Sequence, residues 1–261
     1  TAIGYQALDA FTTGPGNTAV GVNSLTAVTT GDYNVGLGYN TGAGLTSGAL
    51  NVAIGYTALQ ADSQGSGTVA IGQQAGLLQN FGAVTTYNTL VGANAGNKNL
   101  NTGIHFTAIG ANAGHYATGS YNTFVGSSAG RGGTTSAPYS SAQYNTAIGY
   151  EALKGFTSGT GRNVAIGYQA AVASTTGRDN VIIGYEAGHD ITSTVETVLI
   201  GAYAGTKLNS ADANGTVVIG MNALSTATDA VRCVAIGYEA GVKLKTDDNV
   251  AIGFRSMRNI G

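Results

Sequence analysis

The sequence has very little charge, almost no proline, a single cysteine and no tryptophan. Of its 261 residues, 11 are Lys or Arg, 13 are Asp or Glu and 2 are Pro, and the formal net charge is −2. So few basic residues cannot form the basic patch of a nucleic-acid-binding protein. One cysteine excludes a disulfide framework within the chain and a zinc site built from cysteines.

Long hydrophobic runs are absent as well. No apolar run approaches the roughly 20 residues needed to span a bilayer, so we expect no membrane insertion in this segment. Disorder is excluded by composition, because 43% of the residues are hydrophobic and the net charge is close to zero. The 42 glycines lack the every-third-residue spacing of collagen.

What the sequence does contain is one short motif, repeated along its whole length. Residues 53–58 read AIGYTA and residues 147–152 read AIGYEA. Fifteen copies align on a central glycine, which we call the anchor. The intervals between successive anchors are 16 to 23 residues long, and seven of them are 17 residues long. The anchors are Gly4, Gly21, Gly38, Gly55, Gly72, Gly92, Gly110, Gly126, Gly149, Gly167, Gly184, Gly201, Gly220, Gly237 and Gly253. Because the motif is constant while the connections vary, we predict one repeat domain over residues 1–261.

The residues before each anchor are typical of a short β-strand. One residue before the anchor stands Ile in eleven repeats, and three residues before it stands only Thr or Val. The position between them is Ala in nine repeats. β-branched residues at alternate positions favour a strand, and the glycine-rich connections exclude a helix. We therefore predict an all-β fold, a parallel β-solenoid of about fifteen coils in which each strand pairs with its equivalents above and below.

Both faces of the predicted strand are apolar, so one face must be assigned to the core. We assign the Thr/Val and Ile positions to the inside of the coil, as a buried ladder of Ile54, Ile71, Ile109, Ile148, Ile166, Ile183, Ile200, Ile219 and Ile236. The middle column would then be an exposed apolar stripe, which soluble monomers rarely carry. We therefore predict a homo-oligomer whose seam is filled by the larger residues of that column: Leu90, Phe124, Ile182, Leu199 and Val218.

The motif resembles a known family. Residues 51–58 (NVAIGYTA) and 163–170 (NVAIGYQA) are similar to the head repeat of trimeric autotransporter adhesins and to repeats in bacteriophage tail fibres. The resemblance implies a left-handed β-roll assembled as an extracellular homotrimeric fibre. The 17-residue coils and uneven loops look more like a phage tail fibre, a virion component, with a bacterial adhesin head as the alternative. Because the chain begins inside a repeat and shows no polar cap, we expect it to be a segment of a longer fibre.

Residues that could carry chemistry are scattered, and we predict no catalytic, cofactor-binding or metal residues. Asn stands four positions before the anchor in nine repeats, which predicts a stacked, hydrogen-bonded ladder, since Asn alone is a poor cation ligand. Cys233 occupies the same column as a small buried substitute. His105, His115 and His189 share no spacing, so we expect them to be solvated or locally bonded.

Tyrosines and glutamates also recur at the motif. We predict that the tyrosines after the anchors pack at the coil corner, with a sugar-binding platform as the alternative: Tyr5, Tyr39, Tyr56, Tyr150, Tyr168, Tyr185 and Tyr238. Glu151, Glu186 and Glu239 follow such a tyrosine and are expected to be solvated. A tailspike-like glycan hydrolase would instead need a close acidic pair.

The longest connection, residues 127–144, is the best candidate for surface recognition, because loops on a rigid scaffold often carry binding residues. It contains Arg131, Pro138, Tyr139 and Tyr144, and residues 73–88 form a second candidate stretch. The function predicted is a structural and adhesive fibre that attaches to a host or surface, with a cell-surface glycan or protein receptor as partner. An ice-binding solenoid is a further alternative. It needs a flat exposed Thr array, whereas the exchange of Thr with Val suits a buried face.

Overall fold

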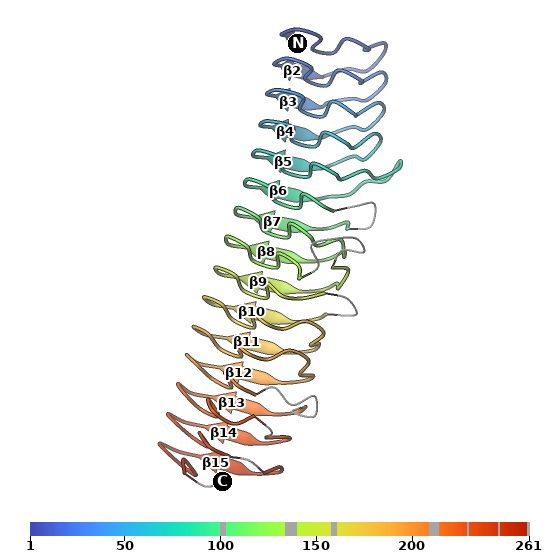
Figure 1. Ribbon diagram of the computed structural model, residues 1–261. Helices are drawn as coiled ribbons and strands as arrows, with labels where there is room; N and C mark the ends of the chain where they lie inside the picture. The colour runs from blue at the N-terminus through green and yellow to red at the C-terminus, as the bar shows by residue number, and fades with distance from the viewer. Residues whose placement is uncertain are drawn as a thin grey trace. The chain divides into compact units, whose positions relative to one another are not determined.

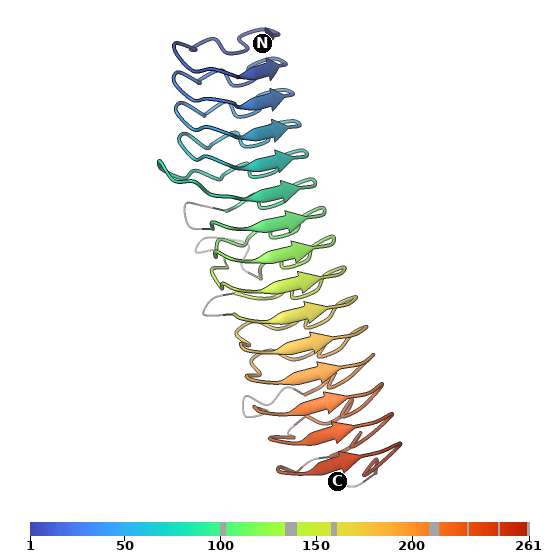
Figure 2. The same cartoon turned by 180° about the vertical axis from the view of Figure 1, so that it is seen from behind.

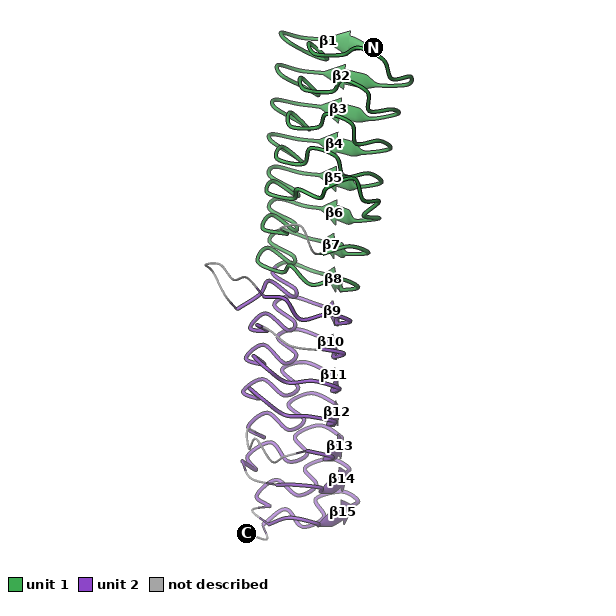
Figure 3. Ribbon diagram, turned by 90° about the vertical axis from the view of Figure 1, so that its right-hand side faces the viewer, with its two compact units in different colours: residues 1–127 green, residues 128–261 purple. Residues whose placement is uncertain are grey.

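The computed structural model describes residues 1–99, 103–133, 140–157, 161–208, 214–228, 230–244 and 246–259. The chain divides into two compact units, residues 1–127 (unit 1) and 128–261 (unit 2), which we describe separately (Figure 3). Both units consist of stacked coils with one short strand each, and the described residues contain no helix (Figure 1, Figure 2). The predicted all-β parallel solenoid is confirmed, while the single repeat domain stays a prediction.

The strands pair in parallel with their neighbours in chain order within each unit. Unit 1 contains β1 (Ala2–Ile3), β2 (Thr18–Val20), β3 (Val35–Leu37), β4 (Val52–Ile54), β5 (Val69–Ile71), β6 (Thr89–Val91), β7 (Thr107–Ile109) and β8 (Thr123–Val125). Unit 2 contains β9 (Thr146–Ile148), β10 (Val164–Ile166), β11 (Val181–Ile183), β12 (Val198–Ile200), β13 (Val217–Ile219), β14 (Val234–Ile236) and β15 (Val250–Ile252). Equivalent motif positions face each other, as Ala53 faces Ala70 between β4 and β5.

The anchor glycine ends each strand and allows the coils to approach closely. Gly167 has a φ of +135°, a conformation that residues with a Cβ rarely adopt. A Cβ on Gly167 would also lie close to the carbonyl oxygen of Gly184, the anchor of the next coil. The repeat therefore requires glycine here both for the backbone conformation and for the close stacking of coils.

The assignment of the strand faces from sequence was wrong. The middle column points into the coil, where Ala53, Leu90 and Phe124 are all 0% exposed within a single chain. The Thr/Val and Ile columns point outward, and Ile109 and Ile148 are each 39% exposed. The nine isoleucines that we expected to be buried are half-buried or exposed. The five predicted seam residues, Leu90, Phe124, Ile182, Leu199 and Val218, instead belong to the coil core.

The narrow coil interior explains why the smaller column lies inside. The residue four after the anchor packs against the middle column, and in several coils the sizes of the two are reciprocal. Leu59 accompanies Ala53, whereas Gly205 accompanies Leu199. A Cβ on Gly205 would lie 2.7 Å from Cδ2 of Leu199. These coils thus have room for about one large side chain between the two positions, as expected for a close-packed core.

The Asn column forms the predicted ladder in both units. In unit 1, the backbone N–H of Asn34 donates to Oδ1 of Asn17 at 2.8 Å, and that of Asn51 donates to Oδ1 of Asn34 at 3.0 Å. In unit 2, the backbone N–H of Asn163 donates to Oδ1 of Asn145 at 3.1 Å. These side chains are buried, so each amide satisfies a backbone group that water cannot reach.

Candidate functional site

The most extensive candidate surface is the outward-facing side of the strands, which we call the outer strand face. It consists of the residues one and three positions before each anchor, all of them Ile, Val, Leu or Thr. Alternation along a strand places these two positions on one face and the middle residue on the other. In each unit this face is therefore largely apolar, with threonine hydroxyls but without a charged side chain, and partly open to solvent.

Tyrosine rings line the edge of this face, directly after the anchors. The rings of Tyr168 and Tyr185 stack with centroids 5.0 Å apart and planes 9° apart, and those of Tyr39 and Tyr56 stack at 5.5 Å. Tyr150 stacks on Tyr168 in the same way. The predicted corner packing is seen here as ring stacking. A sugar ring cannot lie flat on an inner ring of such a stack, because both ring faces already contact a neighbour.

A second corner lies directly before the Asn column, where the backbone is left-handed. In unit 1 four of the side chains at this corner are aromatic: Tyr33, Tyr87, His105 and Tyr121. The imidazole of His105 stacks between the rings of Tyr87 and Tyr121, with centroid distances of 5.3 and 5.2 Å. The other two histidines also have local contacts, His115 with the ring of Tyr116 and His189 with the carboxylate of Asp190, as expected from their lack of shared spacing.

In unit 2 the same corner carries ion pairs. Nη2 of Arg162 donates to Oδ2 of Asp179 at 2.7 Å, and Arg232 binds Asp248 through two hydrogen bonds of 2.7 and 2.9 Å. These hydrogen bonds from arginine hold the pKa values of Asp179 and Asp248 below the usual range. Such bidentate pairs are the strongest form of arginine–carboxylate contact.

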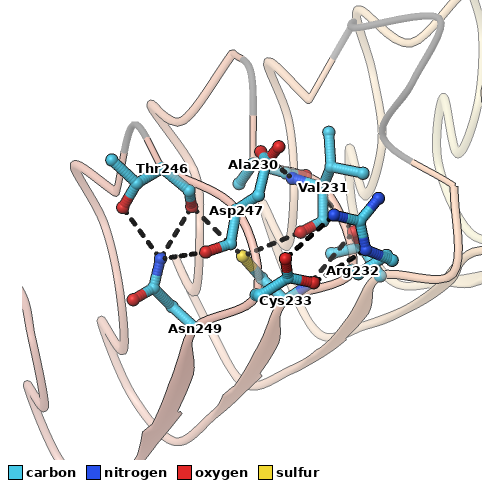
Figure 4. A network of polar contacts seen from close by, with 9 residues as sticks. Ala230, Val231, Arg232, Cys233, Thr246, Asp247 and Asn249 are labelled. Atoms are coloured by element: carbon cyan, nitrogen blue, oxygen red, sulfur yellow. Dashed lines mark hydrogen bonds and ion pairs between the residues drawn. The ribbon is translucent and has the colours of Figure 1, made fainter.

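Cys233 takes part in the network of hydrogen bonds next to this corner (Figure 4). The buried thiol of Cys233 lies in the Asn column and donates to the carbonyl oxygen of Val231 at 3.4 Å. In the next coil, Nδ2 of Asn249 donates to the carbonyl oxygen of Thr246 at 2.7 Å. Cys233 is therefore a small hydrogen-bonded substitute for Asn, in line with the prediction.

The recurring glutamates bind neighbouring groups. Partial desolvation acts to raise the pKa of Glu151, but hydrogen bonds from Lys154 and Gln169 outweigh it and lower the pKa. A hydrogen bond to Glu186 raises the pKa of Tyr185 to about 12.

Glu239 binds the guanidinium groups of Arg255 and Arg258, so it is not simply solvated as expected. In the part of the chain that the structure describes, no three His, Cys, Asp or Glu side chains are grouped so that they could hold a metal ion.

The predicted recognition loop is described only in part. Pro138 and Tyr139 lie outside the described residues. Tyr144 is an exposed residue of the corner before the Asn column. Arg131 lines a cavity of about 340 Å³ that Lys154 also lines.

The second candidate stretch, residues 73–88, contributes to the interior of unit 1. Nε2 of Gln79 donates to Oγ1 of Thr68 at 2.8 Å and contacts Oδ2 of Asp62 at 3.3 Å, and Nδ2 of Asn88 donates to Oε1 of Gln79 at 3.2 Å. All four side chains are buried. Burial raises the pKa of Asp62 despite its hydrogen bonds. This part of the stretch is a buried polar cluster and not a recognition surface.

Sequence reasoning missed the outer strand face, although the sequence carried a signal for it. Gly stands four residues after the anchor beside the larger Leu90, Phe124 and Leu199, and Leu stands there beside Ala53 and Ala147. The signal is incomplete, because Gly also accompanies the small residues Gly36, Ala70, Ala108 and Ala235. Such reciprocal sizes within one coil indicate that these two positions share the interior.

No protein-family model, no curated protein and no solved structure matches the chain. Within the described ranges there is also no helix of the length and hydrophobicity needed to traverse a lipid bilayer.

Proposed function

We propose that this chain is a structural and adhesive segment of an extracellular fibre, in which three copies associate along the outer strand face. The observation that carries the proposal is the character of that face. It is largely apolar and uncharged, and it repeats in register from coil to coil in both units. Extended apolar surfaces of this kind are typical of protein–protein interfaces.

The energy of association would come from many small contributions. Burying the remaining exposed part of a half-buried Ile or Val contributes about 0.5–1 kcal/mol. The same contribution recurs in successive coils of every chain, so the sum over a unit is large. A closed ring buries this face on all copies, which is why symmetric assemblies of this kind stop growing sideways.

The number of chains and the biological setting come from the motif resemblance. The sequences at residues 51–58 and 163–170 are similar to repeats of trimeric fibres. From the same resemblance we propose that the coils form a left-handed β-roll. The setting proposed is a phage tail fibre that attaches to a host, and the alternative is the head of a bacterial surface adhesin. In both settings the mechanism is rigidity, since backbone pairing between coils and the seam between chains resist shear and proteolysis.

The corrected assignment of the strand faces removes one reason for setting the ice-binding alternative aside. The Thr/Val column is on the outside, so the argument that this column is buried is wrong. Thr still occupies only six of the fifteen positions, and Val interrupts the array. No observation on this face favours ice binding over association.

Sedimentation equilibrium tests the proposal. We expect the wild-type chain to sediment as a trimer. Ile166→Asp should shift it toward monomer while leaving the coil folded, because the side chain points outward and three like charges would meet at the seam. Thr176→Asp is the matched control, since Thr176 is exposed in a connection of the same unit and should leave the assembly unchanged. A wild-type monomer at high protein concentration would overturn the proposal.

A further inference from the structure

A hollow in unit 2 combines two cationic side chains with an apolar floor. It has a volume of about 340 Å³, and its lining residues are Arg131, Gly132, Gly133, Lys154, Gly155, Val172 and Ala173. This volume is at the small end of the range for ligand pockets and suits one compact ring. The lining residues that the structure describes belong to three coils of the same unit.

The repeat explains why the hollow exists at this place. Gly132, Gly155 and Ala173 occupy the same position, six residues after their anchors. Three successive coils therefore present almost no side chain there. In the next coil the equivalent residue is Asp190, which has a longer side chain.

The repeat also places the two cations on neighbouring coils. Arg131 and Lys154 are both five residues after an anchor, and Val172 follows in the third coil. Equivalent positions of adjacent coils are about 4.8 Å apart, so both side chains can reach one bound group. An anionic group bound between them would accept charge-assisted hydrogen bonds from both.

Glu151 competes for this position. Oε1 of Glu151 lies 2.6 Å from Nζ of Lys154, and Oε2 of Glu151 accepts a hydrogen bond from Gln169 at 2.9 Å. Glu151 therefore neutralises part of the positive charge. Nζ of Lys154 carries two further protons that can be donated to a ligand.

We infer that this hollow binds an acidic saccharide, with its anionic group between Arg131 and Lys154 and its ring against Val172 and Ala173. The ring of a pyranose has an apolar face that fits the aliphatic floor. Its hydroxyl groups can donate to backbone carbonyl oxygens of the glycines, since the N–H groups of Gly133 and Gly155 already donate to other coils. The inference rests on the proposed adhesive function in one respect, because it names the class of surface receptor that the fibre would bind.

Calorimetric titration of the full chain with small glycosides tests the inference. Methyl glucuronide should bind about tenfold or more tightly than methyl glucoside, which has the same ring without the carboxylate. Tighter binding of glucose 6-phosphate than of methyl glucuronide would indicate a phosphorylated receptor, and the reverse order would indicate a carboxylated one. Inorganic phosphate is the probe for charge alone, and equal binding of phosphate and the glycosides would overturn the assignment to a saccharide.

Variants separate the predicted contacts from general charge effects. Arg131→Gln and Lys154→Gln should each weaken binding of the acidic glycoside by about tenfold. Glu151→Gln should strengthen it, because it removes the competing carboxylate. Arg162→Gln is the control, since Arg162 does not line the hollow. Failure of wild type to bind any acidic glycoside would overturn the inference, as would equal binding by all four variants.

The same samples keep this inference separate from the fibre proposal. A trimer that binds no acidic glycoside contradicts only the receptor class. A monomer that binds methyl glucuronide contradicts only the assembly. Sedimentation and calorimetry on one preparation therefore give independent answers.

Discussion

The two units share one coil design but differ in the chemistry of the corner before the Asn column. Three coils have glycine at this corner: Gly16, Gly67 and Gly215. The other corner residues are Tyr33, Leu50, Tyr87, His105 and Tyr121 in unit 1, and Tyr144, Arg162, Asp179, Glu196, Arg232 and Asp248 in unit 2. Of all the charged residues, unit 1 contains only Asp9, Asp32, Asp62 and Lys98. His105 and Arg162 nevertheless have nearly the same backbone, with φ values of 52° and 50°. The corner side chain is therefore not what specifies the coil.

If the core specifies the coil, equivalent core substitutions should cost the same in both units. Leu90→Ala in unit 1 and Leu199→Ala in unit 2 each empty a fully buried site, and each should lower the free energy of unfolding by about 2–5 kcal/mol. Urea denaturation of each variant measures this loss. Leu50→Ala removes a leucine of equal size from an exposed corner and should have a much smaller effect.

A compensating substitution sharpens this test. Leu199→Ala combined with Gly205→Leu copies the arrangement of Ala53 and Leu59, so it should recover most of the lost stability. Leu59 adopts a φ of 51° in the equivalent position, close to the 56° of Gly205. No recovery in the double variant would mean that the reciprocal sizes do not reflect shared core volume.

Acid should affect the two units in opposite directions. The pKa of Asp62 is raised by burial, so folded unit 1 binds this proton more tightly than the unfolded chain does. Its contribution to stability is complete below the ordinary value near 3.8 and is lost as the pH rises through the raised pKa. The pKa values of Asp179 and Asp248 are lowered, so their contribution is present above the ordinary value and is lost as the pH falls through the lowered pKa.

Hydrogen exchange resolved by segment, corrected for intrinsic rates, measures this contrast. On acidification we expect greater protection around Asp62 and less protection around the ion pairs of unit 2. Asp62→Asn should remove the acid stabilisation of unit 1 without changing unit 2. Parallel responses of the two units would contradict the assignment of opposite pKa shifts.

The smallest expected effect is at the corner itself. His105→Ala removes a ring stacked on both faces and should cost about 0.5–1.5 kcal/mol, independently of salt. Arg162→Ala, at the equivalent position in unit 2, removes an exposed ion pair and should cost less. That loss should largely disappear at about 1 M salt, where charges are screened within a few ångströms. Thermal melting of both variants at low and high salt makes the comparison.

The sequence alone determined the class of fold and the positions of its strands. Each strand ends one residue before an anchor, and the anchors could be read from the repeat because glycine is required where Gly167 meets Gly184. The Asn ladder was also predictable, since a recurring amide in stacked coils bonds to its equivalents. These features depend on local conformation and on the repetition of identical contacts, both of which are present in the sequence.

Only the tertiary structure decided which strand face lies inside. Alternation separates Leu90 from its neighbours Thr89 and Val91, but both faces are apolar, so the pattern does not say which one is buried. The choice depends on the opposite wall of the coil, where Gly96 leaves room for Leu90. The cavity beside Arg131 was likewise decided by stacking, because it arises where Gly132, Gly155 and Ala173 align in three successive coils. Contacts between residues of different columns depend on how the chain closes each coil, and hydrophobic periodicity along one strand carries no information about that closure.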